Sequence, residues 1–337
     1  MRRWIALAAV VPTIITGAPA QAAPAAGLGG AGVTEATVVA GRGVGATGEP
    51  GAARRAAAGR GAAEPGVARA LQRVAGGRYV ALGDSFTSGP LIPRQHGKPF
   101  ACLRSDHNYP SLVAHALRAG VFADVSCSAA TTADLFKPQH VLFGNNPAQL
   151  ASVTPDTALV TVGIGGNDVG FSKTLYTCAG LSLTAPTGAP CMKHFGATLT
   201  NRVTETAPRI AAVLRTIHAR APHALVVVVG YLRILPSTTG CWPSVPAAAG
   251  DVPYLDRVER SLNRMLADEA RRGGAIFVDD YRGGTGHDMC SAHRWVEPIL
   301  LTHAAMPVHP NALGMRVVAR RVVATLAAAR SAASRAQ

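Results

Sequence analysis

The segment Arg78-Tyr-Val-Ala-Leu-Gly-Asp-Ser-Phe-Thr-Ser-Gly89 decides the fold class and carries the first candidate functional residue. Its apolar run Tyr79–Leu82 predicts a buried strand that ends at Gly83. Ser85 follows on the turn, so its hydroxyl would lie at the carboxyl edge of a parallel sheet, where open α/β folds bind ligands. The turn is not a Gly-x-Ser-x-Gly elbow, because Thr87 occupies the position of the second glycine. A strand followed by a purely structural Asp-Ser turn would give the same pattern.

Four further apolar runs alternate with helix-like stretches, which predicts an α/β fold. The other predicted strands are Val121–Val125, Leu159–Val162, Leu225–Val229 and Ala275–Val278. The predicted helices, with apolar residues at three- and four-residue intervals, are Tyr109–Ala119, Arg202–Ala219, Tyr254–Arg271 and Asn311–Ala329. Because such alternation is typical of a parallel sheet covered on both faces, we expect a three-layer α/β/α sandwich with a central parallel sheet. The walls of a substrate cleft would be the long loops at 86–108, 172–200 and 232–253.

Two more segments resemble the first in ending on polar residues. Asn167 lies in Leu159-Val-Thr-Val-Gly-Ile-Gly-Gly-Asn-Asp168, and His309 lies in Ala305-Met-Pro-Val-His-Pro-Asn-Ala-Leu-Gly314. In order and spacing, the three segments resemble the SGNH (GDS-type) hydrolases, a family of serine esterases and lipases with a flavodoxin-like fold. Residues 78–330 resemble its secreted actinobacterial lipase/esterase branch, also through the segments Arg104–Pro110, Asp124–Asp134, Gly240–Pro243 and Arg294–Pro298.

The first 22 residues have the features of a secretory signal peptide. A basic start at Arg2 and Arg3 precedes the short apolar core Trp4–Ile15, and Ala18–Ala22 offers small-residue cleavage sites. The alternative is a membrane anchor, but the core is shorter than the roughly 20 residues that span a bilayer. We therefore expect a secreted, extracellular protein.

Residues 23–77 consist mostly of Ala, Gly, Pro, Val, Thr and Arg and contain no aromatic residue. Such a segment buries too little apolar surface to offset its chain entropy, so we expect a disordered linker or pro-segment. The catalytic domain would span residues 78–331, followed by a tail at 332–337.

The chain carries a net charge of +14. No cluster of Lys and Arg is interleaved with aromatic residues, so we expect no nucleic-acid partner. Outside a cell, a positive surface would favour anionic membranes or phospholipid interfaces, although an arginine-rich composition without any binding role is the plainer explanation. No later stretch is apolar over a length that would span a membrane.

Ester hydrolysis needs a nucleophile, a base and donors for the oxyanion. Ser85 is the candidate nucleophile, and the resemblance implies His309 as its general base and acid. Many SGNH enzymes have an aspartate three residues before this histidine, where the chain has Met306. We therefore expect a Ser85–His309 dyad, with the main-chain carbonyl of Met306 or Pro307 orienting the imidazole. A remote acid remains the alternative, and the candidates are Asp279, Asp280 and Asp288.

The resemblance implies an oxyanion hole formed by the Ser85 N–H, the Ala129 N–H and the Asn167 side-chain amide. Ala129 replaces the family's glycine, and its Cβ penalises a positive φ. The alternative for Asn167 is a structural role in the turn that follows the strand. Asp84 and Asp168 are expected to shape turns rather than to act as catalytic acids. Two roles are open for Trp242 and Trp295, which are packing in the buried core and lining an acyl pocket.

All six cysteines lie in the predicted catalytic domain, which is consistent with an oxidising compartment. The resemblance implies sequential pairing, and the disulfides would then be Cys102–Cys127, Cys178–Cys191 and Cys241–Cys290. The spacing does not favour zinc, although Cys290 and His293 could form a ligand pair. We expect no metal and no cofactor.

The resemblance implies a secreted lipase or carboxylesterase that cleaves acyl esters of lipids through an acyl-enzyme. We expect a monomer that touches lipid interfaces only transiently. A phospholipase A or a short-chain carbohydrate esterase would use the same machinery. A non-catalytic surface-binding module with this fold is the alternative from another class, but the joint presence of Ser85, Asn167 and His309 argues against it.

Overall fold

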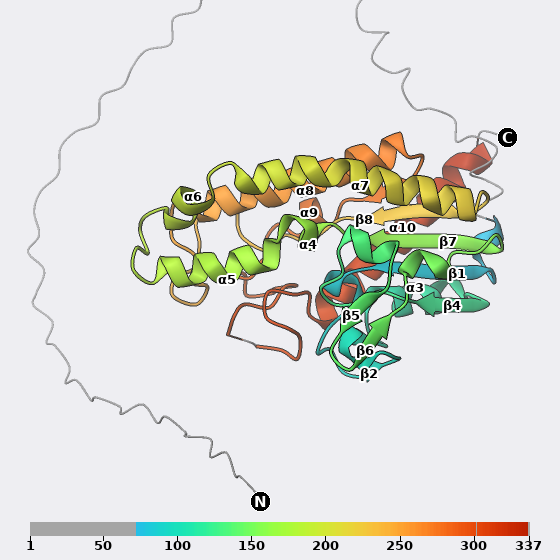
Figure 1. Ribbon diagram of the computed structural model, residues 1–337, viewed down its shortest axis with the longest axis horizontal. Helices are drawn as coiled ribbons and strands as arrows, with labels where there is room; N and C mark the ends of the chain where they lie inside the picture. The colour runs from blue at the N-terminus through green and yellow to red at the C-terminus, as the bar shows by residue number, and fades with distance from the viewer. Residues whose placement is uncertain (1–71, 301, 336–337) are drawn as a thin grey trace, which may run out of the picture. The chain divides into compact units, whose positions relative to one another are not determined.

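The computed structural model describes residues 72–300 and 302–335. A five-stranded parallel sheet lies at the centre, in the order β4-β1-β7-β8-β9 (Figure 1). The strands are β1 (Arg78–Gly83), β4 (Val121–Asp124), β7 (Thr157–Gly163), β8 (Leu225–Val229) and β9 (Ile276–Val278). This is the flavodoxin-like strand order, and the chain reverses its direction across the sheet between β1 and β7. Ligands of such sheets bind at the carboxyl ends of the strands that flank this reversal.

Helices cover both faces of the sheet. The longer ones are α3 (Tyr109–Leu117), α7 (Thr198–Arg220), α8 (Val252–Arg272) and α10 (Ala312–Arg335). In Figure 1, α7 and α8 lie along each other, whereas α3 packs against α10. Right-handed crossovers on the two sides of the reversal place α3 and α7 on opposite faces. The three-layer α/β/α sandwich predicted from the sequence is therefore confirmed.

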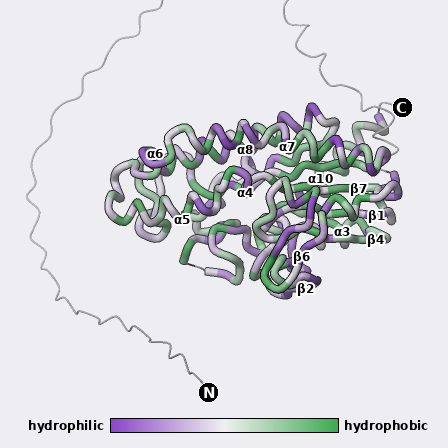
Figure 2. The backbone as a smooth tube through the Cα atoms, in the orientation of Figure 1, coloured by the Kyte–Doolittle hydropathy of each residue, from purple (hydrophilic) through white to green (hydrophobic). Residues whose placement is uncertain are grey.

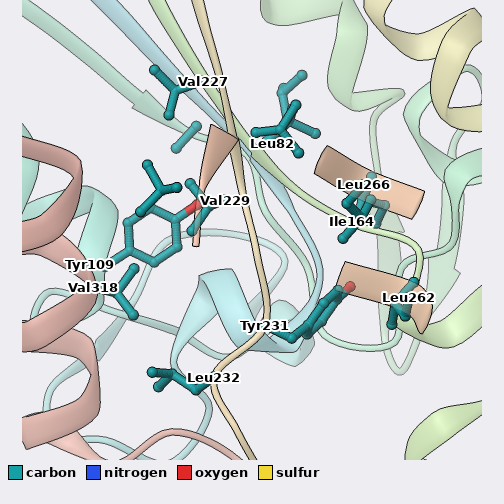
Figure 3. Close-up of a cluster of buried hydrophobic side chains, with 14 of the residues drawn as sticks. Leu82, Tyr109, Ile164, Val227, Val229, Tyr231, Leu232, Leu262, Leu266 and Val318 are labelled. Atoms are coloured by element: carbon teal, nitrogen blue, oxygen red, sulfur yellow. The ribbon is translucent and has the colours of Figure 1, made fainter. Parts of the chain in front are cut away.

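The core follows from the continuous apolar strands. Every residue of β7 and β8 is buried, and the strands are hydrophobic along their length in Figure 2. Buried side chains lie on both sides of the strands in Figure 3, where Val229 lies beside Tyr109 and Ile164 lies beside Leu266. A central strand buried on both faces needs no polar alternation, which is why these runs were recognisable in the sequence.

The expectation of a loop over residues 172–200 is wrong, because most of this segment is helical. It contains α5 (Phe171–Ser182), α6 (Pro190–Phe195) and the start of α7 at Thr198. Buried residues of α5 recur at Phe171, Leu175 and Cys178, which is a helical spacing. The Gly, Thr and Pro content of the segment hid this short pattern. The other two long loops contain only short elements before α8 begins at Val252.

Short elements of the whole described chain include α2 (Ser85–Ser88), the β2–β3 hairpin (Gln95–His96 and Arg104–Ser105), the β5–β6 hairpin (Gln139–Val141 and Gly144–Asn146), α4 (Gly166–Val169) and α9 (Asp280–Gly283). The disulfides join the cysteines that the resemblance implied, Cys102–Cys127, Cys178–Cys191 and Cys241–Cys290. Because Cys290 is bonded to Cys241, it cannot pair with His293 as a zinc ligand.

The expected signal peptide and most of the expected linker lie outside the described residues. Within the described part, Val74 is buried in the core, and Gly77 O accepts a hydrogen bond from Gly120 N at 3.1 Å. At the other end, α10 continues to Arg335, beyond the expected boundary at residue 331, because its alanines favour helix. Among residues 72–300 and 302–335, no helix has the length and apolarity to cross a membrane.

Candidate active site

Ser85 is the first residue of α2, directly beyond β1. Asp84 caps this helix, and its Oδ1 accepts a hydrogen bond from Phe86 N at 2.9 Å. A Cβ on Gly83 would lie 2.1 Å from Thr87 Oγ1 and 2.6 Å from Gly163 O, so the strand-to-helix turn can close only on glycine. The turn holds the Ser85 hydroxyl at the carboxyl end of β1, where its side chain is nearly buried.

His309 lies in the loop that leads into α10. Asn311 caps that helix, since its Oδ1 accepts from Leu313 N and Gly314 N at 3.0 and 2.9 Å. Val308 has a φ of 64°, an unusual conformation for a β-branched residue. This turn folds the His309 ring back toward the carbonyl of Pro307. Backbone bonds with Glu297 hold the turn, at 2.9 Å from Val308 N to Glu297 O and 2.9 Å from Glu297 N to His309 O.

The two side chains meet although 224 positions separate them in the sequence. His309 Nε2 lies 2.8 Å from Ser85 Oγ, and Nδ1 lies 2.7 Å from Pro307 O. Because a carbonyl oxygen only accepts, Nδ1 carries the hydrogen, and Nε2 is free to accept the Ser85 proton. The geometry is that of a nucleophile paired with an oriented base.

The orienting carbonyl is that of Pro307 and not that of Met306, whose O accepts the main-chain N–H of His309 at 3.2 Å. The remote acids are engaged elsewhere. Asp279 accepts from Arg282 N, and Asp288 accepts from Cys290 N, at 3.0 and 2.9 Å. Asp280 Oδ1 lies 3.7 Å from Arg321 Nε. Among the described residues, no carboxylate contacts the His309 ring.

Burial disfavours the charged imidazolium and lowers the pKa of His309 to about 4, although the hydrogen bond to Pro307 acts in the opposite direction. The ring is 4% exposed. The imidazole is therefore neutral near pH 7 and able to accept a proton.

The candidate oxyanion donors lie on three neighbouring segments. Among the described residues, neither the Ser85 N–H nor the Ala129 N–H donates to another group of the chain. Ala129 has a φ of 63°, the conformation that its Cβ penalises, so the site keeps a left-handed residue here without glycine. Asn167 lies on α4 beyond β7, and its Nδ2 donates to Ala130 O at 2.9 Å. This bond ties the asparagine to the Ala129 segment.

Asp168 holds the segment that carries Ala129 and Thr132, and its contacts are not those of a catalytic acid. Its carboxylate accepts from Thr132 N and Thr132 Oγ1 at 2.9 and 2.5 Å. Arg209 lies 3.3 Å away on α7. These contacts agree with the expectation of a turn-shaping role.

Tyr231, which the sequence analysis missed, joins the Ser85 and Asn167 turns. Its hydroxyl donates to Asp84 Oδ2 at 2.5 Å and accepts from Gly166 N at 2.8 Å. Burial raises the pKa of Asp84 to about 7, against the opposing effect of the hydrogen bonds from Tyr231 and Phe86. A tyrosine two residues beyond the end of a central strand was the only sequence signal for this role.

A mostly apolar depression lies beside Ser85 and Asn167. Its apolar lining comes from Phe171, Ile234 and Leu262. Phe86, Ser172 and Ile234 contribute to this lining from the three segments that we expected to form the cleft walls. Trp242 is largely exposed, and Trp295 is buried against the His287 ring, so neither lies in this lining.

Comparisons with known proteins identify the family of the chain. The chain matches the GDSL-like lipase/acylhydrolase family over residues 81–317. It is 39% identical over 255 residues to "Lipase 2" of Streptomyces coelicolor, which covers 74% of this chain and 85% of that protein. It is 33% identical over 247 residues to "Lipase 1" of the same organism, covering 73% of this chain and 85% of that protein.

Two solved structures are similar over about three quarters of the chain. A phospholipase A1 from Streptomyces albidoflavus superposes with a TM-score of 0.65 at 29% identity, covering 74% of this chain and 100% of that one. An extracellular lipase from Streptomyces rimosus superposes with a TM-score of 0.62 at 29% identity, covering 75% of this chain and 99% of that one.

Proposed function

The chain belongs to the GDSL-like lipase/acylhydrolase family and is a carboxylic ester hydrolase, and we propose that it cleaves acyl esters of lipids through an acyl-enzyme on Ser85. The observation that carries the mechanism is the pair of contacts on one imidazole, Nε2 to Ser85 Oγ at 2.8 Å and Nδ1 to Pro307 O at 2.7 Å. His309 is the general base in this proposal, and Pro307 fixes its tautomer.

In the first half-reaction, His309 Nε2 takes the Ser85 proton while Oγ attacks the ester carbonyl carbon. The same nitrogen then gives the proton to the departing alcohol, which leaves the acyl group on Ser85. In the second half-reaction, His309 takes a proton from water as the water oxygen attacks the acyl carbon. It then returns this proton to Ser85 Oγ as the acid leaves, which restores the free serine and the neutral imidazole. Pro307 O holds the ring throughout, although a neutral carbonyl stabilises the imidazolium less than a carboxylate does.

The negative charge on the tetrahedral oxygen needs donors that are in place before the reaction. We assign this role to the N–H groups of Ser85 and Ala129, which have no intramolecular acceptor within the described residues, and to the Asn167 amide. Removing one such donor typically costs about 10²–10³ in kcat, so Asn167→Ala should fall in that range.

Similar proteins that are named lipases support an ester of a lipid as the substrate. A phospholipase A activity is the second candidate, because one similar solved structure is a phospholipase A1. We further propose secretion through residues 1–22, a linker at 23–77 and a catalytic domain over 78–331 that acts as a monomer. One similar structure is that of an extracellular lipase, which supports secretion.

A fluorophosphonate probe tests the nucleophile directly. The wild-type chain should be labelled, Ser85→Ala should not, and His309→Ala should lower both labelling and kcat by at least about 10³. Met306→Ala and Asp288→Asn are the matched controls and should lose little activity. A large loss from Asp288→Asn with the fold intact would contradict the dyad, and an unlabelled wild type would indicate a binding module.

The substrate class is tested with p-nitrophenyl esters from acetate to palmitate beside a phosphatidylcholine. Preference for the longer esters over the phospholipid would support a lipase. Faster release of fatty acid from the phospholipid would favour the phospholipase A alternative.

A further inference from the structure

The tip of the β5–β6 hairpin and a neighbouring turn expose three large apolar side chains, which we call the docking tip: Phe100, Leu142 and Phe143. They are 66%, 71% and 96% exposed, respectively. The two segments lie together, because a Cβ placed on Gly144 would lie 3.5 Å from the Cβ of Pro99. Single exposed apolar residues are common, but three at one projection indicate an interaction surface.

The turn chemistry of the hairpin shows that these residues are unfavourable for the turn itself. Val141 pairs with Gly144, so Leu142 and Phe143 form a two-residue connection. Phe143 has a φ of 60°, a conformation for which hairpin turns use Asn or Gly. A bulky aromatic residue at this position adds backbone strain and exposes apolar surface. The cost of the exposed apolar surface is recovered where the tip is buried against something else.

The base of the hairpin is fixed to the segment that carries the candidate oxyanion donor Ala129. Gln139 Nε2 donates to Ser128 O at 2.8 Å, and Asn146 Nδ2 donates to Val125 O at 3.2 Å. The buried Arg104 joins the neighbouring turn to the same segment, donating to Lys98 O at 2.6 Å and to Ser126 O at 2.8 Å. The docking tip therefore stands on a rigid arm that ends at the active site.

The two segments that carry the docking tip contain basic residues and no acidic ones. Residues 86–105 and 135–155 contain no Asp or Glu. The side chains of Lys98 and Lys137, on these two segments, are exposed. Apolar side chains flanked by exposed lysines match the boundary between the acyl and headgroup regions of an anionic lipid layer.

We propose that the docking tip inserts into anionic lipid surfaces and thereby places the active site at the interface. The inference rests on the proposed lipid-ester function and adds the structural element that binds the lipid surface. The rigid base means that the tip positions Ala129 and Ser85 relative to the lipid layer without a moving lid.

Vesicle binding by the full chain tests the proposal, with vesicles of phosphatidylglycerol and phosphatidylcholine compared with phosphatidylcholine alone. Leu142→Asn and Phe143→Asn should each weaken binding to the anionic vesicles by about tenfold, because less apolar surface leaves water. Asn tolerates the φ of residue 143, so this variant should fold at least as well as the wild type. Leu183→Asn, at a residue 69% exposed on the end of α5, is the matched control and should bind normally.

The charge is tested by Lys98→Gln and Lys137→Gln. Each should weaken binding to the anionic vesicles by about fivefold and leave binding to the neutral vesicles unchanged. Hydrolysis of p-nitrophenyl butyrate in solution should stay at the wild-type rate in all of these variants, whereas hydrolysis of an ester held in the vesicles should fall with binding.

Three results would overturn the inference. The tip variants could bind vesicles like the wild type, they could lose solution activity in parallel, or they could change a dimer into a monomer, which would make a second copy the occupant. Fluorophosphonate labelling of Ser85 in the same samples reports on the proposed function separately.

Discussion

At the residue scale, His309 differs from the base of a full triad in having a neutral partner. Pro307 O fixes the tautomer at 2.7 Å but contributes only a dipole to the charged form. Burial is the larger influence and lowers the pKa of His309 to about 4. The absence of an aspartate at residue 306 therefore has a measurable consequence, which is a base that resists protonation.

The first prediction concerns the pH dependence of kcat/KM. Only neutral His309 can accept the Ser85 proton, so activity is lost as pH falls through its folded-state pKa. Because this pKa is lowered to about 4, kcat/KM for a soluble ester should stay constant from pH 7 to about 5 and should fall only below about pH 4. Initial rates followed by product chromatography measure this. An acid limb near the ordinary value of about 6.5 would contradict the lowered pKa.

Asp84 provides the control for this experiment. Burial raises its pKa to about 7, but its carboxyl bonds to Phe86 N and the Tyr231 hydroxyl rather than to His309, so we expect no limb from it. Asp84→Asn should therefore keep the limb near pH 4. A variant in which the limb near pH 4 disappears would show that the limb belongs to the Asp84–Tyr231 pair.

At the element scale, the features predicted best from the sequence were those that depend only on residues close together in the chain. The buried strands were located to within a few residues, because continuous apolar runs have no competing explanation. The α5–α6 region was missed, because its short helices mix apolar residues with Gly, Thr and Pro. The loop before α10 was recognised by its histidine. The side chain that holds this loop in place was not recognised.

That group is Glu297, whose carboxylate is fully buried. Oε1 accepts from Asn311 Nδ2 and His303 Nδ1, and Oε2 accepts from Thr302 N, Thr302 Oγ1 and His303 N, all at 2.8–3.0 Å. Burial raises the pKa of Glu297, but these hydrogen bonds outweigh it, so the pKa is lowered to about 2. The ionised carboxylate organises the loop that carries His309.

The second prediction is that Glu297→Gln loosens this loop. Both oxygens only accept, so the amide NH₂ of glutamine would face donors in either orientation. We expect kcat to fall by about tenfold or more and the free energy of unfolding to fall by about 2 kcal/mol at pH 7. Because the folded-state pKa is lowered, the wild type should lose this stability as pH falls from about 4.5 toward 2, and the variant should lose less.

Urea unfolding at neutral and acid pH, together with kcat for a soluble ester, measures both effects. Asp106→Asn is the control, because the pKa of this carboxyl is also lowered but it is only partly buried and lies beside Arg94. The control should change both quantities little. Equal behaviour of the two variants would show that Glu297 has no special role.

At the scale of the whole molecule, topology explains why two of the candidate catalytic residues lie together. The ends of β1 and β7 meet where the chain reverses across the sheet, so Ser85 and Asn167 had to lie together once the strands were assigned. His309 followed from the family resemblance. Tyr231, Glu297 and the choice of Pro307 depend on contacts between distant segments, and no local pattern contains that information.

The last prediction concerns the start of the folded domain. Residue 78 was the boundary expected from composition, but Val74 is 5% exposed, and Gly77 O accepts from Gly120 N at 3.1 Å. A chain starting at Gln72 should therefore retain kcat for a soluble ester to within about twofold. A chain starting at Arg78 should lose about 2–3 kcal/mol of unfolding free energy, because a buried side chain and edge hydrogen bonds are removed.

Urea unfolding of both chains measures this loss. Val74→Ala in the longer chain separates the contribution of the Val74 side chain from that of the backbone hydrogen bonds. Inactivity of the chain from Gln72 would instead show that the preceding residues take part in catalysis.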